Sequence, residues 1–197
     1  MRDSYRSSSD GRHDALVHQK LTRGSKIAEH VAAAAPAKKT VLIDTFGGVG
    51  GNTIAFAKSG RWNKIFSIEK DDATLKCAKH NAKVYGVDKK IWFIKGDCFQ
   101  VLVKQLKPLG KDAVIFASPP WGGPGYRGDS IFDLETMEPY GLRKLYDGYC
   151  KVSKDIVLYL PRTSDLNEIA ELAKEDKQIP VTHYCMRGAS KVCQLSF

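Results

Sequence analysis

The sequence has 197 residues, of which 43% are hydrophobic and 27% charged, so it is long and apolar enough for one globular domain and is neither collagen-like nor repetitive. Its net charge of +9 indicates either a polyanionic partner such as nucleic acid or simply a basic protein. Because it has no apolar run near the ~20 residues that span a bilayer and no signal peptide, we expect a soluble, non-secreted protein.

The amino-terminal part divides into two segments of different composition. Residues 1–12 are mostly Ser, Arg, Asp and Gly, and we expect a flexible basic tail there. Residues 13–36 carry apolar side chains at helical spacing, and Pro36 ends this helical segment. The remaining residues, 37–197, are predicted to form one domain. Five cysteines without a CxxC pair or zinc spacing indicate reduced thiols inside the cell.

From residue 41 onward, short β-branched runs alternate with amphipathic stretches, which is typical of parallel strands joined by helical crossovers. The expected strands are Val41–Asp44, Lys64–Glu69, Ile91–Lys95, Ala113–Ala117 and Ile156–Leu160. The expected helices are Asn52–Lys58, Ala73–Tyr85, Phe99–Lys107, Leu142–Val152 and Leu166–Lys174. Two further strands, Val181–Met186 and Lys191–Phe197, are joined tightly and predict an antiparallel hairpin. The fold class is therefore α/β, with a mostly parallel seven-stranded sheet, an antiparallel C-terminal hairpin and helices on both faces.

The first expected strand ends in an acid, Asp44, followed by a loop with Gly47, Gly48 and Gly50. Glycines let the backbone turn tightly and approach a ligand closely. The G-x-G-x-x-G pattern of nicotinamide cofactors is broken by Thr53. An acid at the strand end suits S-adenosylmethionine (SAM), whose ammonium group it can attract. The alternative is a tight turn that binds no ligand.

The next two expected strands also end near acids, Glu69 and Asp97. In a parallel sheet these ends meet at one edge, where ligands bind. Glu69 can accept both hydroxyls of a ribose, and Asp97 can accept the amino group of adenine while Cys98 or Phe99 packs on the ring. Taken singly, either acid could instead cap a helix. Three such acids together with the glycine loop point more specifically to SAM.

The fourth expected strand leads into Ser118, Pro119, Pro120 and Trp121. Two prolines remove two N–H donors and hold the backbone extended, so that carbonyl groups and the Ser118 side chain can accept the hydrogens of an amine. Trp121 offers a flat face for stacking a base, with added attraction if the base is cationic. Catalysis would consist of positioning and desolvation, without a general base. Alternatively, the segment is a rigid turn whose Trp121 fills the core.

The sequence resembles the trimethylguanosine synthase family, which methylates N2 of the 7-methylguanosine (m7G) cap of small RNAs. The resemblance rests on five runs of residues. They are Lys26–His30, Asp44–Asn52, His80–Gly86, Ser118–Tyr126 and Leu160–Arg162. The SPPWGGP string with its following Tyr126 is the specific part. The chain departs from the family in its short, polar amino-terminal segment, in Glu69 where Asp is usual, and in Gly47 where Cys is usual.

The resemblance implies a Rossmann-like class I methyltransferase and assigns roles to residues in three groups. The cofactor group comprises Asp44, Gly47, Gly48, Gly50, Glu69, Asp97 and Ser118. The transfer group comprises Ser118, Pro119 and Trp121. The cap group comprises Asn81 at the base edge, Trp121 on the base, and Tyr126, Arg162 and Lys191 as phosphate contacts.

The implied reaction transfers methyl from SAM to the N2 amine of m7G-capped RNA, giving di- or trimethylguanosine. We expect a monomer that binds neither metal nor membrane and acts in the nucleus or nucleolus, with the cytoplasm as the alternative. Two other functions stay open. One is methylation of internal guanine N2 or adenine N6 in RNA or DNA. The other is a non-catalytic module that binds RNA or cofactor.

Overall fold

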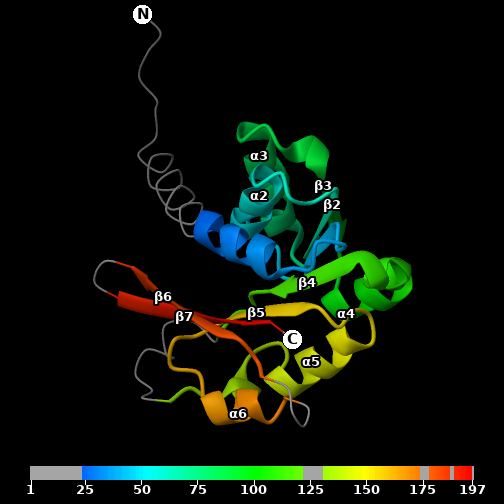
Figure 1. The fold of residues 1–197 in the computed structure, drawn as a ribbon. Helices are drawn as coiled ribbons and strands as arrows, with labels where there is room; N and C mark the ends of the chain where they lie inside the picture. The colour runs from blue at the N-terminus through cyan, green and yellow to red at the C-terminus, as the bar shows by residue number, and fades with distance from the viewer. Residues whose placement is uncertain (1–23, 122–130, 174–177, 187–188, 197) are drawn as a thin grey trace, which may run out of the picture.

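A computed structural model describes residues 24–121, 131–173, 178–186 and 189–196 of the chain (Figure 1). The strands are β1 Val41–Asp44, β2 Lys64–Glu69, β3 Ile91–Lys95, β4 Ala113–Ala117, β5 Ile156–Leu160, β6 Val181–Met186 and β7 Ala189–Ser196. The named helices are α2 Gly51–Lys58, α3 Asp72–Val84, α4 Cys98–Val101, α5 Leu142–Cys150 and α6 Leu166–Ala170. A further helix at residues 24–34 precedes β1.

Within the described ranges the strands form a seven-stranded sheet in the order β3-β2-β1-β4-β5-β7-β6. The first five strands run parallel, whereas β7 pairs antiparallel with both β5 and β6. This confirms the predicted α/β class. The chain order reverses between β1 and β4, because β1 pairs with β2 on one side and with β4 on the other. A ligand crevice is expected there, at the carboxyl ends of the strands.

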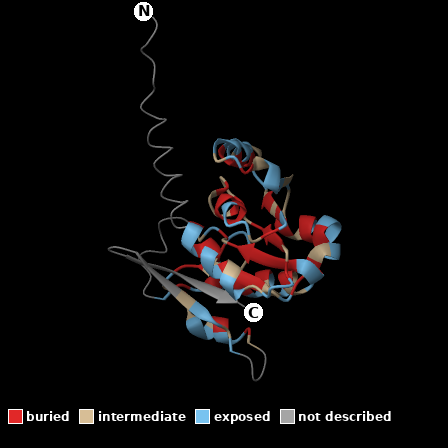
Figure 2. Cartoon of the chain, turned by 45° about the horizontal axis from the view of Figure 1, so that its top comes forward, coloured by how far each residue is buried: buried red, intermediate tan, exposed pale blue. Residues whose placement is uncertain are grey.

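Apolar clusters cover both faces of the sheet, and Figure 2 shows the buried residues concentrated along the central strands. On one face, the helix at residues 24–34 and α2 pack through Ile27, Val31 and Ile54 against Leu42 of β1. On the other face, α4, α5 and α6 contribute a cluster that includes the fully buried Tyr149. Burial on both faces explains why the central strands read as continuous apolar runs in the sequence.

Tyr149 also makes a polar tie between this helical layer and the sheet. The hydroxyl of Thr45, directly after β1, donates to the Phe116 carbonyl of β4 at 3.1 Å. The Thr45 and Tyr149 hydroxyls are also hydrogen-bonded to each other, 2.8 Å apart. These two bonds fix the end of β1 against β4 and α5, at the edge of the sheet where a ligand is expected.

The helices differ from expectation mainly at their carboxyl ends. The expected helix Phe99–Lys107 is α-helical only over α4 and continues as a π-helix, Leu102–Leu106, and a 3-10 helix, Lys107–Asp112. Both α5 and α6 end earlier than predicted. The last strand begins at Ala189 rather than Lys191. The expected basic tail lies outside the described residues, as does the first part of the helical segment.

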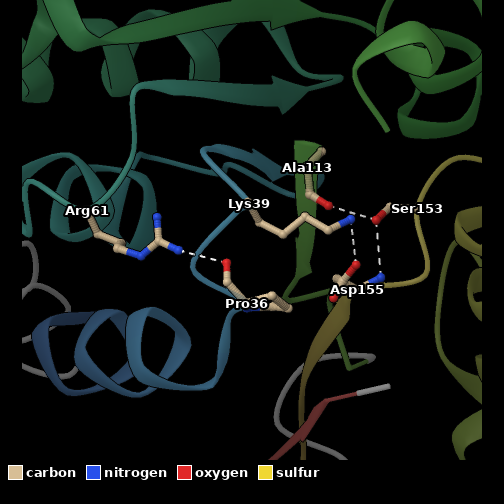
Figure 3. A network of polar contacts seen from close by, with 6 residues as sticks. All are labelled: Pro36, Lys39, Arg61, Ala113, Ser153 and Asp155. Atoms are coloured by element: carbon tan, nitrogen blue, oxygen red, sulfur yellow. Dashed lines mark hydrogen bonds and ion pairs between the residues drawn. The ribbon is translucent and has the colours of Figure 1, made fainter. Parts of the chain in front are cut away.

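A buried ion pair joins the segment before β1 to the start of β5 (Figure 3). The Lys39 Nζ lies 2.6 Å from Asp155 Oδ2, and the two side chains are 8% and 23% exposed. Ser153 completes the network, because its hydroxyl donates to the Ala113 carbonyl at 2.7 Å and accepts from the Asp155 N–H at 3.1 Å. The network lies at the amino-terminal ends of the strands, opposite the crevice, and its role is structural.

None of the helices in the described part of the chain is long and apolar enough to cross a membrane.

Candidate active site

The loop after β1 is held in a tight conformation that requires glycine. Gly48 and Gly50 have φ angles of 53° and 90°, a region that side chains disfavour. The N–H of Gly47 donates to the Ile68 carbonyl at 2.9 Å, and a Cβ at Gly47 would collide with Ser67 Oγ. The family's usual Cys at this position would therefore need Ser67 to move. Among the described residues, a Cβ at Gly48 meets nothing within 4 Å, so the space over the loop is open.

The carboxylate of Asp44 lies beneath this loop and is fully buried. Its Oδ2 accepts a hydrogen bond of 2.6 Å from the Thr53 hydroxyl, and its Oδ1 accepts a longer one of 3.4 Å from the Phe46 N–H. Burial raises the pKa of Asp44 to about 6, and the bond from Thr53 offsets part of that rise. The predicted attraction of Asp44 for a cation would therefore act through its charge rather than through an exposed oxygen.

The raised pKa predicts that SAM affinity depends on pH. Below a pH of about 6, Asp44 is protonated and cannot attract the ammonium group of SAM, so affinity should rise as pH increases from about 5 to about 7 and then level off. As pH rises from about 4 to about 6, the free energy of unfolding of the ligand-free protein should fall, because ionisation of the buried Asp44 disfavours the folded state. Calorimetric titration at several pH values measures the first effect.

The matched control for this titration is 5′-methylthioadenosine, which shares the nucleoside of SAM but lacks its amino acid. Its affinity should stay flat across the same pH range. A flat profile for SAM itself would show that Asp44 does not face the ammonium group.

The carboxylate of Glu69 joins the glycine loop to the end of β2. Its Oε2 accepts the Gly48 N–H at 2.9 Å and its Oε1 accepts the Asp71 N–H at 2.8 Å. The backbone carbonyl of Glu69 also accepts the Gly96 N–H at 3.0 Å, which brings the loop after β3 alongside. Each carboxylate oxygen keeps acceptor capacity, so the group still fits a pair of ribose hydroxyls.

Asp97 is the N-cap of α4 and has a second partner that sequence reasoning missed. Its Oδ1 accepts from the N–H groups of Phe99 and Gln100, both at 3.1 Å. Its Oδ2 accepts from the Tyr140 hydroxyl at 2.6 Å. A helix cap is the alternative role that the sequence indicates for Asp97, but nothing in the sequence links Asp97 to a tyrosine 43 positions away. A role for Asp97 in binding adenine stays a prediction.

The predicted packing of Cys98 or Phe99 on adenine also stays a prediction. Cys98 is 4% exposed, and burial raises the pKa of its thiol to about 12, which makes it unreactive. The Phe99 ring is half-buried and contacts two tyrosine rings, with centroids 4.7 Å from Tyr140 and 5.7 Å from Tyr149. The described contacts of Phe99 are therefore with aromatic side chains of the protein.

Directly after β4, Ser118 lies beside the glycine loop. The Asn52 Nδ2 at the start of α2 approaches the Ser118 Oγ at 3.4 Å, which connects the predicted transfer segment to the predicted cofactor loop. Asn52 belongs to the run that carries the family resemblance, but no role was predicted for it. Pro119 is buried, whereas Trp121 is half-buried.

The indole of Trp121 is half-buried, and its Nε1 atom is shielded from solvent. Its ring centroid is 5.9 Å from that of Tyr159 on β5, with the planes inclined by 31°. Trp121 contacts the edge of the apolar cluster that contains Tyr149, while remaining partly exposed. The stacking role of Trp121 and the alternative of a Trp that fills the core therefore both stay predictions.

The remaining predicted cap residues have different surroundings. Asn81 is 7% exposed and its Nδ2 donates to the Val49 carbonyl at 2.9 Å, so here it braces the glycine loop. Arg162 is exposed and follows β5, at the same edge of the sheet as the acids. Tyr126 and the side chain of Lys191 lie outside the described residues. Within those residues, no group of His, Cys, Asp or Glu is arranged to hold a metal ion.

Comparison with solved structures identifies the fold. The fold matches that of the O-methyltransferase TomG from Streptomyces achromogenes, solved with SAM, at a TM-score of 0.60 and 10% identity over 89% of this chain and 78% of that chain. The chain thus shares its fold with this methyltransferase.

Sequence comparison then identifies the family. Residues 39–197 match the family described as RNA cap guanine-N2 methyltransferase. The chain is 35% identical to the trimethylguanosine synthase of Schizosaccharomyces pombe over 77% of its length, and to that of Saccharomyces cerevisiae over 76%. It therefore belongs to the RNA cap guanine-N2 methyltransferase family. The matches span 62% and 47% of these two relatives.

Proposed function

We propose that this chain transfers methyl from SAM to the exocyclic N2 amine of the m7G cap of RNA, giving di- or trimethylguanosine. The observation that carries the proposal is the contact between Asn52 and Ser118, because it sets the amine-accepting segment against the glycine loop. Family membership and the two trimethylguanosine synthase relatives support the same substrate. A nuclear or nucleolar location, expected from the resemblance, is part of this proposal.

The residues present fit SAM as the cofactor. The space over Gly48 is open, Glu69 keeps acceptor positions for ribose hydroxyls, and the buried Asp44 supplies negative charge beneath the loop. When bound, SAM supplies an electrophilic methyl group on a sulfonium. The charge of Asp44 would hold the ammonium end of the amino acid, and Glu69 would fix the sugar.

The transfer segment would then prepare the attacking amine. The N2 lone pair of guanine is delocalised into the ring, which makes the amine a poor nucleophile. Ser118 and the carbonyl of Pro119 would accept the two N2 hydrogens, which favours a pyramidal nitrogen whose lone pair points at the methyl group. SAM would supply the methyl group and keep the electrons of its broken C–S bond as a neutral thioether, and the methylated amine would release its extra proton to water.

Trp121 would provide the selectivity for a methylated cap. 7-Methylguanine is cationic, and a cation stacked on an indole is more strongly attracted than a neutral guanine. The half-buried position of Trp121 beside Tyr159 leaves part of the ring available for such stacking. Arg162, exposed at the same edge, would contact the phosphates of the cap.

The proposal is tested by incubating the protein with SAM and three substrates: an m7G-capped RNA, the same RNA with an unmethylated cap, and uncapped RNA. Mass analysis of nucleosides released from the products should show dimethyl- or trimethylguanosine from the first substrate alone. Because the number of methyl groups is read from the mass, the same measurement identifies the product.

Three outcomes would contradict the proposal. Equal methylation of both capped RNAs would rule out selection of the cationic base. Methylguanosine or methyladenosine within the uncapped RNA would favour the alternative of internal methylation. Binding of SAM without transfer to any RNA would favour a non-catalytic module.

A further inference from the structure

The Tyr140 side chain is fixed over Asp97 by three contacts. Its hydroxyl donates to Asp97 Oδ2 at 2.6 Å, and its ring packs on Phe99 with centroids 4.7 Å apart. The Nζ atom of Lys144 lies over the Tyr140 ring, 4.4 Å from its centroid. The backbone that follows is anchored as well, because the Arg143 N–H donates to Glu135 Oε1 at 2.7 Å. Tyr140 therefore presents its hydroxyl to Asp97 in a defined direction.

Counting acceptor positions shows what remains free on Asp97. An ionised carboxylate offers about four positions, two on each oxygen. The N–H groups of Phe99 and Gln100 take both positions on Oδ1, and the Tyr140 hydroxyl takes one on Oδ2. One position on Oδ2 is left. The bonds from Phe99 and Gln100 hold Oδ1, and the bond from Tyr140 holds Oδ2. Together they fix the orientation of the carboxylate, and with it the direction of the last acceptor position.

The proton between Tyr140 and Asp97 stays on the tyrosine. The hydrogen bond to Asp97 raises the pKa of Tyr140 to about 12, and burial adds to that rise. The phenol is therefore a donor at any physiological pH. All three protein partners of Asp97 are donors, so the last position on its carboxylate offers a further acceptor.

We propose that Tyr140 is a positioning residue that makes Asp97 an obligate acceptor, so that the cofactor pocket selects a purine with a 6-amino group and rejects a 6-oxo purine. The inference rests on the proposed role of Asp97 in holding adenine. Adenine would donate its amino hydrogen to the last position on Oδ2. Hypoxanthine presents a carbonyl oxygen there, and two acceptors repel each other. Selectivity for the cofactor base thus depends on a residue in the segment between β4 and β5.

The test compares binding of S-adenosylhomocysteine and S-inosylhomocysteine, which differ in the 6-amino and 6-oxo groups and in the hydrogen that the 6-oxo base carries on N1. Calorimetry would be done on the wild-type protein and on Tyr140→Phe, which keeps the ring contacts with Phe99 and Lys144. Loss of the bond from Tyr140 to Asp97 should lower the affinity for S-adenosylhomocysteine by about tenfold, and the affinity for S-inosylhomocysteine much less. The ratio of the two affinities should therefore shrink by nearly the same factor.

Tyr85→Phe is the matched control. Tyr85 lies at the end of α3, where its ring faces Lys58 at 5.4 Å, and it has no contact with Asp97 among the described residues. The affinity ratio should be unchanged in this variant. Thermal melting of both variants shows whether they are folded.

A second variant, Asp97→Asn, keeps a good N-cap but adds a donor to the pocket. Its amide can donate to a 6-oxo group, so the preference should move toward the inosyl ligand, and this holds even if Tyr140→Phe does not fold. Equal losses for both ligands in Tyr140→Phe, or an unchanged preference in Asp97→Asn, would overturn the inference. Failure of the wild type to bind S-adenosylhomocysteine would overturn the cofactor site and this inference together. Normal selectivity without cap methylation would contradict only the proposed function.

Discussion

Replacing Trp121 with Ala should lower kcat/KM for an m7G-capped substrate by roughly a hundredfold, because it removes both the stacking surface and the attraction between indole and cation. The affinity for S-adenosylhomocysteine should change little, because the predicted cofactor residues lie at Asp44, Glu69 and Asp97. Steady-state kinetics with a capped dinucleotide, together with calorimetry of cofactor binding, measure the two effects separately.

Trp121→Phe is the matched variant for this prediction. A phenyl ring retains a smaller stacking face and the contact with Tyr159, so most of the activity should return. If the alanine variant keeps its full kcat/KM on the capped substrate, Trp121 does not stack on the base. If cofactor binding and kinetics fail together, the residue supports the fold of the crevice instead.

Replacing Lys39 with Met should lower the free energy of unfolding by about 2–3 kcal/mol, because it leaves the Asp155 carboxylate without its counter-ion in a largely buried position. The pair is short, 2.6 Å between Nζ and Oδ2, and Lys39 is 8% exposed. Urea denaturation monitored by circular dichroism measures the change, which should appear as a lower midpoint with an unchanged slope.

The double variant Lys39→Met with Asp155→Leu tests the cause of this loss. If the cost comes from the isolated charge, removing both partners should restore most of the stability. Arg61→Ala is the control, since its guanidinium donates to the Pro36 carbonyl at an exposed site and should contribute less than about 1 kcal/mol. A double variant as unstable as Lys39→Met alone would show that lost packing, and not the charge, is responsible.

Much of the sheet could be predicted from sequence, because strands that are buried on both faces have apolar side chains at consecutive positions. The bounds of β1 through β6 are those expected, and the antiparallel pairing of β7 follows from the tight connection to β6. The irregular end of α4 could not be predicted in the same way. Pro108 indicates that an α-helix ends nearby, but the sequence pattern does not tell a π-turn from an α-turn over Leu102–Leu106.

Of the site, the sequence could predict which polar residues lie at the ends of individual strands. Asp44 and Glu69 end a strand and Asp97 and Ser118 follow one, so the parallel sheet places all four at one edge. The contacts between these ends were not predictable, because they join residues far apart in the chain. Asn52 reaches Ser118 across 66 positions, and Tyr140 reaches Asp97 across 43.

The position of β7 between β5 and β6 also governs the order in which the nascent chain can assemble. β6 leaves the ribosome before β7, yet in the described sheet β7 is its only neighbour. The parallel core from β1 to β5 can therefore close during synthesis, while β6 must wait unpaired for the next strand. Until β7 has been made, both β5 and β6 have unpaired edges that can pair with other chains. A chaperone would therefore influence the yield most at this stage, and so would a premature stop codon that leaves the chain without β7.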